Sequence, residues 1–416
     1  MRSLKFCLAA LMLTGCPEDD EVTLVADAAV DTQLSALDQA TLDVLFVIDN
    51  SGSMASEQLK LAQEIPRMVA VLTSGDRYAT REKDVPPGLD EKSRRFTPVR
   101  SLHLGVVSTN FGGVDELPSN SQAAIRSCAN TGDSGKLLSS AAIATQGVIA
   151  TTQSEFEGYG AGAVVLPPDP SCDLAGLPRY QAFEAGSDPS AAAHAFRCAA
   201  RVGVRGCPFE QPLESMWSAL APSNVRDDLH TFLNGTRGNG DVFNAGFLRP
   251  GAALAVVLLT DEDDCSITDE GKAMFSLQGD AQAEYGNLNL RCMNNETDGN
   301  LVRAVERYRD GLLGLKPGHP ERVVFTAIAG LPLDARSRSF DDVLADPSMV
   351  NAEDPQQQGF PRVSCTSAKG DKAYPARRLV RAAKLFPNAL VESICAEEYA
   401  SVVDATVNAI ASLMGP

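Results

Sequence analysis

The sequence predicts an α/β protein with a Rossmann-like, doubly wound and mostly parallel sheet that is flanked by helices and carries long loop insertions. Two runs, 43–48 and 252–259, are short and almost wholly apolar. Such runs indicate strands that are buried on both faces, as in parallel sheets. They alternate along the chain with segments whose apolar residues have helical spacing, and this alternation is typical of α/β folds.

The remaining elements follow the same alternation. Leu61, Ile65, Met68 and Leu72 lie at helical spacing and predict an amphipathic helix over 55–73. By the same criteria we expect strands at 102–107, 322–329 and 389–394, a short strand at 164–166, and helices at 191–202, from about 206–213 to 220, and at 298–314, 376–385 and 396–413.

One domain is predicted to cover residues 42–415. The first and last strong elements belong to one alternating pattern, and no internal repeat divides it. Polar stretches with many Gly, Ser and Pro residues interrupt the pattern, and we interpret them as insertions into loops. They lie near 74–100, 114–190, 266–297 and 331–375.

The N-terminal residues have the pattern of an export signal. A short basic start precedes an apolar stretch, 6–13, that is too short to span a membrane permanently. Residues 13–16, Leu-Thr-Gly-Cys, resemble the lipobox of bacterial lipoproteins. The resemblance implies that a signal peptide, 1–15, is removed and that Cys16 is lipidated.

A lipid anchor at Cys16 would place the protein in the cell envelope, on a periplasmic or cell-surface face. Several acyl chains hold a protein on a membrane firmly, whereas one chain does so only marginally. Residues 16–41 are small and acidic, and we interpret them as a flexible linker. An ordinary secretory signal followed by an incidental cysteine is the alternative.

The charge balance restricts the partners. The formal net charge of −18 argues against nucleic acid, whose phosphates need a basic surface. A divalent cation or a basic partner fits such a surface.

Eight cysteines remain when Cys7 of the leader and Cys16 are set aside. An even number in an exported chain predicts up to four disulfides. We expect pairing between sequence neighbours, because each pair brackets a single loop-like segment: 128–172, 198–207, 265–292 and 365–395.

Both strongly apolar runs lead into oxygen-bearing side chains. Asp49, Ser51 and Ser53 follow the first run at alternating positions, and Asp261 follows the second. Loops at the carboxyl edge of parallel strands are where α/β proteins bind ligands, and these oxygens suit Mg²⁺, Mn²⁺ or Ca²⁺. The first loop is also good chemistry for a turn and a helix N-cap. The D-x-S-x-S spacing, together with an aspartate after a later buried strand, resembles the metal-ion-dependent adhesion site of von Willebrand factor type A (VWA) domains.

The resemblance implies a divalent cation held by Asp49, Ser51, Ser53 and Asp261, with Mg²⁺ preferred and Ca²⁺ or Mn²⁺ as alternatives. It further implies that an acidic side chain of a protein partner completes the metal shell, which is binding without catalysis. A structural envelope protein whose VWA fold serves assembly without metal is the second hypothesis. A hydrolase is the third, and no GxSxG, HExxH or Walker A motif supports it.

One ligand expected from the resemblance is in question. Many VWA domains add a threonine from a loop just ahead of a helix, and the apolar spacing places Cys207 at that position. Thr109, Glu210 and Asp241 are the alternatives. The acidic run 262–264 is interpreted either as a solvated loop or as a second, Ca²⁺-type site, although it does not match the EF-hand pattern.

Overall fold

The computed structural model describes most of the predicted domain. Described are residues 40–112, 132–139, 169–204, 206–223, 236, 238–276 and 279–414. All of them lie in one compact unit, Ala36–Pro416.

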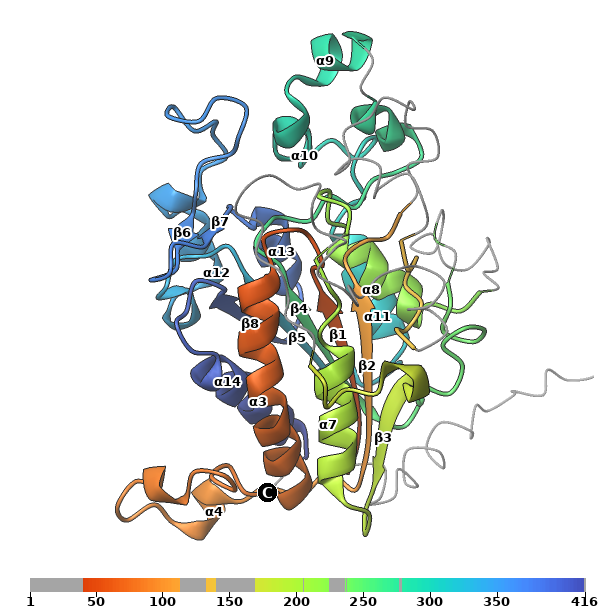
Figure 1. Cartoon of the computed structure of the whole chain (residues 1–416), viewed down its shortest axis with the longest axis vertical. Helices are drawn as coiled ribbons and strands as arrows, with labels where there is room; N and C mark the ends of the chain where they lie inside the picture. Colours follow the sequence, from red (N-terminus) through yellow and green to blue (C-terminus); the bar gives the residue numbers. More distant parts are fainter. Residues whose placement is uncertain are drawn as a thin grey trace, which may run out of the picture. The chain divides into compact units, whose positions relative to one another are not determined.

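A six-stranded mixed sheet forms the centre of this unit (Figure 1), and its strand order is β3-β2-β1-β4-β5-β8. Every neighbouring pair is parallel except β2 and β3, which are antiparallel. The expected α/β, mostly parallel sheet is therefore confirmed. The strands are β1 (Thr41–Ile48), β2 (Ser101–Ser108), β3 (Tyr180–Glu184), β4 (Ala253–Leu259), β5 (Val323–Ala329) and β8 (Asn388–Ser393).

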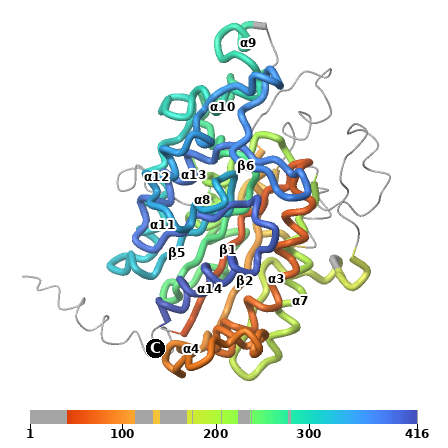
Figure 2. Tube along the Cα trace, turned by 90° about the vertical axis from the view of Figure 1, so that its left-hand side faces the viewer, coloured from red at the N-terminus to blue at the C-terminus, as the bar shows by residue number. Residues whose placement is uncertain are grey.

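Helices cover both faces of the sheet, and this explains why its central strands are apolar throughout. In β1, Val44 and Phe46 pack into one core and Leu45 and Val47 into the other. Figure 2 shows α3 and α7 on one side of β1, and α11 and α13 on the other. The first core is covered by α3 (Ala55–Ser74), α7 (Pro189–Ala199) and α14 (Ala400–Met414), the second by α8 (Pro212–Leu220), α11 (Glu306–Gly314) and α13 (Arg377–Ala383).

Shorter elements lie in the insertions. A two-residue-per-strand hairpin, β6 (Cys365–Thr366) with β7 (Lys372–Ala373), stands apart from the main sheet. The short helices are α4 (Glu91–Arg94), α9 (Gly279–Tyr285), α10 (Arg291–Asn294) and α12 (Phe340–Leu344).

One strand of the structure was not predicted, one predicted helix begins later than expected, and one predicted strand lies outside the described residues. Strand β3 falls in a segment that was expected to be irregular. It was not predicted because burial alternates along this edge strand, so that the sequence shows no apolar run. The helix expected at 298–314 begins only at Glu306, since Val302 instead forms an isolated β-bridge with Ile267. The strand expected at 164–166 is not among the described residues.

Three disulfides join described cysteines. The expected pairs 265–292 and 365–395 are confirmed. The expected pairs 128–172 and 198–207 are wrong, because Cys172 is bonded to Cys198. This bond fastens the segment after Asp169 to α7, where Arg197 also binds Asp169 at 2.7 Å. Cys207 is disulfide-bonded as well, and Cys128 lies outside the described residues.

Disulfides of this number are typical of proteins that fold in an oxidising, extracytoplasmic compartment. Within the described part of the chain, no helix is long and apolar enough to cross a membrane.

Candidate functional site

The strand order creates a switch point between β1 and β4. The chain leaves β1 for β2 on one side, and it returns through β4 to the other side of β1. In open α/β sheets, ligands bind in the crevice outside the carboxyl ends of the strands at such a point. Asp49 follows β1 directly and Asp261 lies two residues beyond β4, so both residues flank this crevice.

Asp49 is fixed across the crevice by β4. Its backbone N–H donates to the Leu259 carbonyl at 2.8 Å, and its carboxylate accepts from Thr260 Oγ1 at 2.8 Å. The Ser51 backbone N–H donates to the other carboxylate oxygen at 2.7 Å, which folds the loop back over the aspartate. The Asp49 side chain is fully buried, so these hydrogen bonds fix its position.

The two predicted serines lie beside each other in the same loop. Their hydroxyl oxygens are 3.1 Å apart, and the Ser53 side chain also hydrogen-bonds to Asp261. Mg²⁺ requires octahedral bonds of ~2.1 Å. Adjacent ligand atoms in such an octahedron are about 3.0 Å apart. The serine oxygens are therefore spaced to take neighbouring positions around one such ion.

Burial raises the pKa values of both aspartates, and repulsion from neighbouring carboxylates adds to the shift of Asp261. For Asp49 the largest cause is desolvation, which outweighs the hydrogen bonds from Ser51 and Thr260. For Asp261 desolvation comes first and repulsion from Asp49 second, and they raise its pKa well above the usual range. Asp261 Oδ1 is buried without a hydrogen-bond partner. The four predicted residues are thus brought together in a place short of positive charge.

Glu210 joins this cluster, although it was only one of three alternatives for the missing ligand. Its loop is attached to the loop of Asp49, because the Gly206 N–H donates to the Asn50 carbonyl at 2.6 Å. It is also attached to the end of β2, because the Gln211 N–H donates to the Thr109 carbonyl at 3.0 Å. Glu210 is 1% exposed, and one of its carboxyl oxygens has no hydrogen-bond partner. Desolvation, followed by repulsion from Glu262, Asp49 and Asp261, raises its pKa well above normal.

The position just ahead of α8 is therefore occupied by Glu210, not by Cys207. Cys207 is taken up in a disulfide. Asp241 is exposed and its carboxylate accepts from the Ser223 N–H. The Thr109 N–H donates to the Ile48 carbonyl at 3.1 Å, and its buried hydroxyl has no hydrogen-bond partner. Pro212 is the sequence signal that could have identified Glu210. Proline is favoured at the first residue of a helix, so Pro212 marks the start of α8, and Glu210 lies two residues before that start.

The acidic run 262–264 divides into two structural carboxylates and one that faces the cluster. Asp264 is buried in an ion pair with Arg378 at 3.0 Å. Asp263 accepts the backbone N–H groups of Arg378 and Leu379 at the start of α13. Glu262 instead hydrogen-bonds to Glu210, and burial raises its pKa to about 7. The run is therefore not a solvated loop.

Among the described residues, no lysine or arginine forms an ion pair with the four carboxyl groups of Asp49, Glu210, Asp261 and Glu262. Nor do any three His, Cys, Asp or Glu side chains of this part of the chain form a metal-binding group by themselves. An ion held by Asp49 and Asp261 would therefore need ligands of another type as well, and the Ser51 and Ser53 hydroxyls are available in the same loop.

Two pockets open beside the cluster. The first, of about 220 Å³, has a lining that includes Ser53, Glu57, Asp261, Asp371 and Lys372. We call it the hairpin pocket because β7 and the turn between β6 and β7 contribute to that lining. Asp371 is held to α3 by the Ser56 hydroxyl at 3.0 Å. The second pocket, of about 200 Å³, lies on the side of Glu210 and Glu262.

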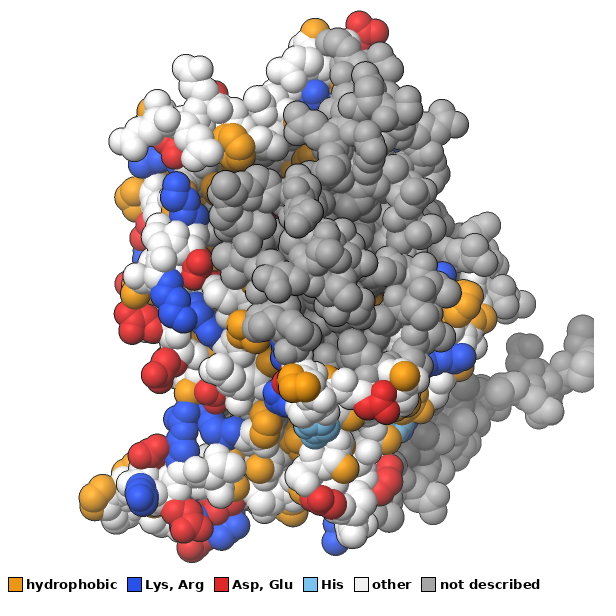
Figure 3. All heavy atoms as spheres, in the orientation of Figure 1, with side chains coloured by type: hydrophobic (Ala, Val, Ile, Leu, Met, Phe, Trp, Pro, Cys, Tyr) orange, Lys and Arg blue, Asp and Glu red, His pale blue; other side chains and the backbone are white. Residues whose placement is uncertain are grey.

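Charge elsewhere is mixed. On the face in Figure 3, basic and acidic side chains are interspersed over the described surface, and they do not gather into a basic patch there.

The fold defines the class of protein as a Rossmann-like α/β protein with a carboxyl- and hydroxyl-rich site at the switch point of its sheet. No protein-family model, curated protein or solved structure matches the chain.

Proposed function

We propose that this chain is a VWA-type lipoprotein of the cell envelope, and that it binds a protein partner through a divalent cation held by Asp49, Ser51, Ser53 and Asp261. The observation that carries the proposal is the pair of buried aspartates at the switch point, which lack a lysine or arginine partner among the described residues.

A divalent cation resolves the electrostatic problem of this pair. Two carboxylates ~4 Å apart repel by about 4 kcal/mol at an effective dielectric constant of ~20. A nearby buried carboxylate, Asp264, has Arg378 as its partner. The two aspartates lack such a partner in the described part of the chain, and a bound metal ion would take its place. Mg²⁺ is preferred, and Mn²⁺ and Ca²⁺ accept the same oxygens.

The hairpin pocket supplies the place for a partner's acidic side chain. It reaches Ser53 and Asp261 from outside, and the exposed Lys372 stands on its rim. A carboxylate that completes the metal shell from this pocket would find Lys372 for its outer oxygen. Binding of this kind breaks no bond, and we propose no enzymatic activity.

The location rests on two features. The leader and Cys16 support export and lipidation, and the disulfides support an oxidising compartment. A membrane-anchored binding protein of the envelope, on its periplasmic or cell-surface face, accommodates both.

A structural envelope protein without a metal is the second candidate. The observation in its favour is that Glu262 and Glu210 hydrogen-bond to each other, as do Asp49 and Asp261. Protons shared within these pairs would hold the cluster together without an ion.

Calorimetric titration of the mature chain with Mg²⁺, Mn²⁺ and Ca²⁺ separates the two candidates. We expect saturable binding that is lost in Asp49→Ala. The matched control is Glu270→Gln, which removes an exposed carboxylate that lines neither pocket. The metal function is refuted if no ion binds, or if Asp49→Ala binds as well as the unmodified chain.

A further inference from the structure

The second pocket combines carbon-rich walls with an acidic floor. Phe209, Met293, Phe360 and Tyr374 contribute to its walls, while Glu210 and Glu262 lie at its inner end. We call it the acid-floored pocket. Phe360 is 37% exposed and so marks the rim, whereas Glu210 is 1% exposed and marks the deepest part.

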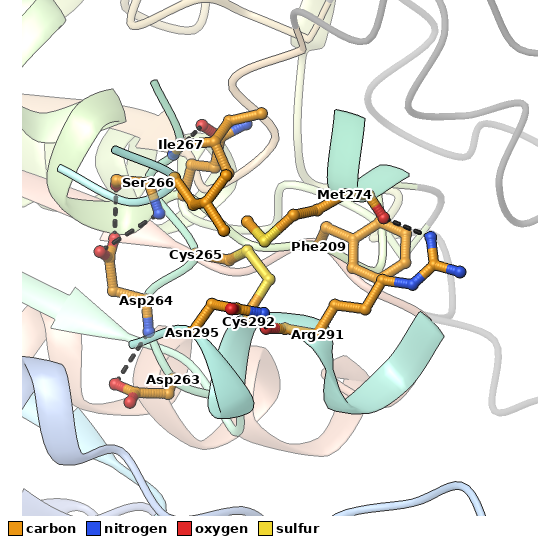
Figure 4. Close-up of a disulfide and its surroundings, with 12 residues drawn as sticks. Phe209, Asp263, Asp264, Cys265, Ser266, Ile267, Met274, Arg291, Cys292 and Asn295 are labelled. Carbon is orange, nitrogen blue, oxygen red and sulfur yellow. Dashed lines mark hydrogen bonds between the residues drawn. A yellow bond between two sulfur atoms is a disulfide. The ribbon is translucent and has the colours of Figure 1, made fainter. Parts of the chain in front are cut away.

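The walls are held in place before any ligand arrives. Figure 4 shows Phe209 beside the Cys265–Cys292 disulfide, which ties α10 to the loop after β4. The Phe209 ring packs on Phe275 with a centroid distance of 4.6 Å. The Arg291 guanidinium on α10 is bound to the carbonyls of Met274 and Ser276, so it is not directed at the acidic floor.

The floor lacks a compensating cation in the described part of the protein. Glu210 has a carboxyl oxygen that is buried without a hydrogen-bond partner, and neither it nor Glu262 forms an ion pair. The next two acids in the loop, Asp263 and Asp264, are bound by Arg378 and by the start of α13. Among the four acids that line the pocket, Glu210 and Glu262 are thus the two that no lysine or arginine of the described residues engages, and they hydrogen-bond to each other.

We infer that the acid-floored pocket takes a lysine or arginine side chain of the protein partner. The apolar stem would lie along Phe209 and Tyr374, which also offer aromatic faces to a cation. The charged end would meet Glu262, with Glu210 behind it. The inference rests on the proposed function, because it takes from it that the ligand is a protein.

An organic cation fits this pocket better than a second metal ion. A bound Ca²⁺ takes about six to eight oxygen ligands. Here most of the lining is carbon, so the pocket offers too few free oxygens for such a shell. A side chain with an apolar stem uses both parts of the lining.

The two pockets together define the kind of partner. The Tyr374 N–H, in the wall of the acid-floored pocket, donates to the backbone carbonyl of Asp261 at 2.8 Å, and Asp261 lines the hairpin pocket. The pockets are therefore separated by little more than the strand end that carries Asp261 and Glu262. A partner would present an acidic side chain to the metal and a basic one to the neighbouring pocket.

Methyl NMR of the mature chain tests this inference without the unknown partner. The probe is the ¹³C-methyl signal of Met293, assigned through Met293→Leu. In EDTA we add n-pentylammonium as a lysine mimic, propylguanidinium as an arginine mimic, and n-pentanol as the uncharged control. We expect saturable shifts with either cation and much smaller ones with pentanol. Glu262→Gln should weaken cation binding by about tenfold, the effect of losing one charge-assisted contact.

Two further samples keep the result separate from the proposed metal function. Asp49→Ala should bind pentylammonium at least as well as the unmodified chain, because Asp49 does not line this pocket and loss of its charge favours ionisation of Glu210 and Glu262. Glu270→Gln, which does not line the pocket either, should bind it unchanged. Absence of a Met293 shift, equal effects of pentanol and pentylammonium, or an unaltered affinity in Glu262→Gln would overturn the inference. It is likewise overturned if Ca²⁺ shifts Met293 in Asp49→Ala and displaces pentylammonium, because the pocket would then be a second metal site.

Discussion

Replacing Asp261 with asparagine should make the metal-free protein more stable while abolishing its response to metal. The asparagine keeps the shape of the side chain and can still accept from Ser53, but it removes one of two like charges that burial forces together. In an apolar surrounding the repulsion is about 4 kcal/mol at ~4 Å and an effective dielectric constant of ~20. Part of it is already relieved by shared protons, so we expect a net gain of about 1–3 kcal/mol in unfolding free energy at pH 8.

The metal response should change in the opposite direction. A cation at ~100 times its dissociation constant stabilises the native chain by about 2.7 kcal/mol. The unmodified chain should show this increment and Asp261→Asn should not.

Denaturant unfolding with intact disulfides measures both effects. Each chain is unfolded in EDTA and again in saturating Mg²⁺, and the slopes with denaturant are compared to check that the transition remains two-state. The reasoning is refuted if Asp261→Asn is less stable than the unmodified chain in EDTA, or if both chains gain the same increment from Mg²⁺.

Three further predictions concern the neighbours of this pair. The pKa of Glu262 is raised from 4.5 to about 7 in the folded state. Between these two values the folded state keeps a proton that the unfolded state loses. The stability of the metal-free chain should therefore fall as pH rises from about 4.5 to about 7. Glu262→Gln should remove up to ~3 kcal/mol of that fall, and identical pH profiles of the two chains by thermal unfolding would contradict this. A Cβ at Gly206 would lie 1.9 Å from Asn50 Oδ1, so Gly206→Ala should displace the Asp49 loop and weaken metal binding by about tenfold or more in calorimetry. Gly299→Ala, where nothing lies within 4 Å, is the matched control and should bind metal normally. Arg378→Met should leave Asp264 buried and unpaired, which costs about 3–5 kcal/mol of unfolding free energy; a loss under ~1 kcal/mol would show that the pair is not structural.

The fold was largely predictable because its signal is local. A strand covered on both faces must be apolar at every position, and β1, β4 and β5 meet that requirement without reference to the rest of the chain. Strand β3 was missed because an edge strand with one partner needs only alternate burial. The helix before Glu306 was overpredicted because the bridge between Val302 and Ile267 is a long-range contact that helical spacing does not reveal.

The site was predictable where it follows directly from strand ends. Asp49 and Asp261 come together because β1 and β4 are parallel neighbours, and this follows from two short motifs. Glu210 was harder to assign, since its place depends on how its loop is attached to the chain around Asn50. The different roles of Glu262, Asp263 and Asp264 could not be separated in sequence, because they depend on Arg378, more than a hundred residues away in the chain.

The central claim is that one divalent cation lies between the two strand ends. Crystals of the mature chain grown with Mn²⁺ and measured at the manganese absorption edge test it most directly. We predict one anomalous peak within about 2.2 Å of both Ser51 Oγ and Ser53 Oγ, next to Asp49 and Asp261, which disappears in Asp49→Ala. The account would be contradicted by a fully occupied Mn²⁺ site elsewhere with no peak next to Ser51 and Ser53. It would also be contradicted by the absence of any anomalous peak at saturating Mn²⁺.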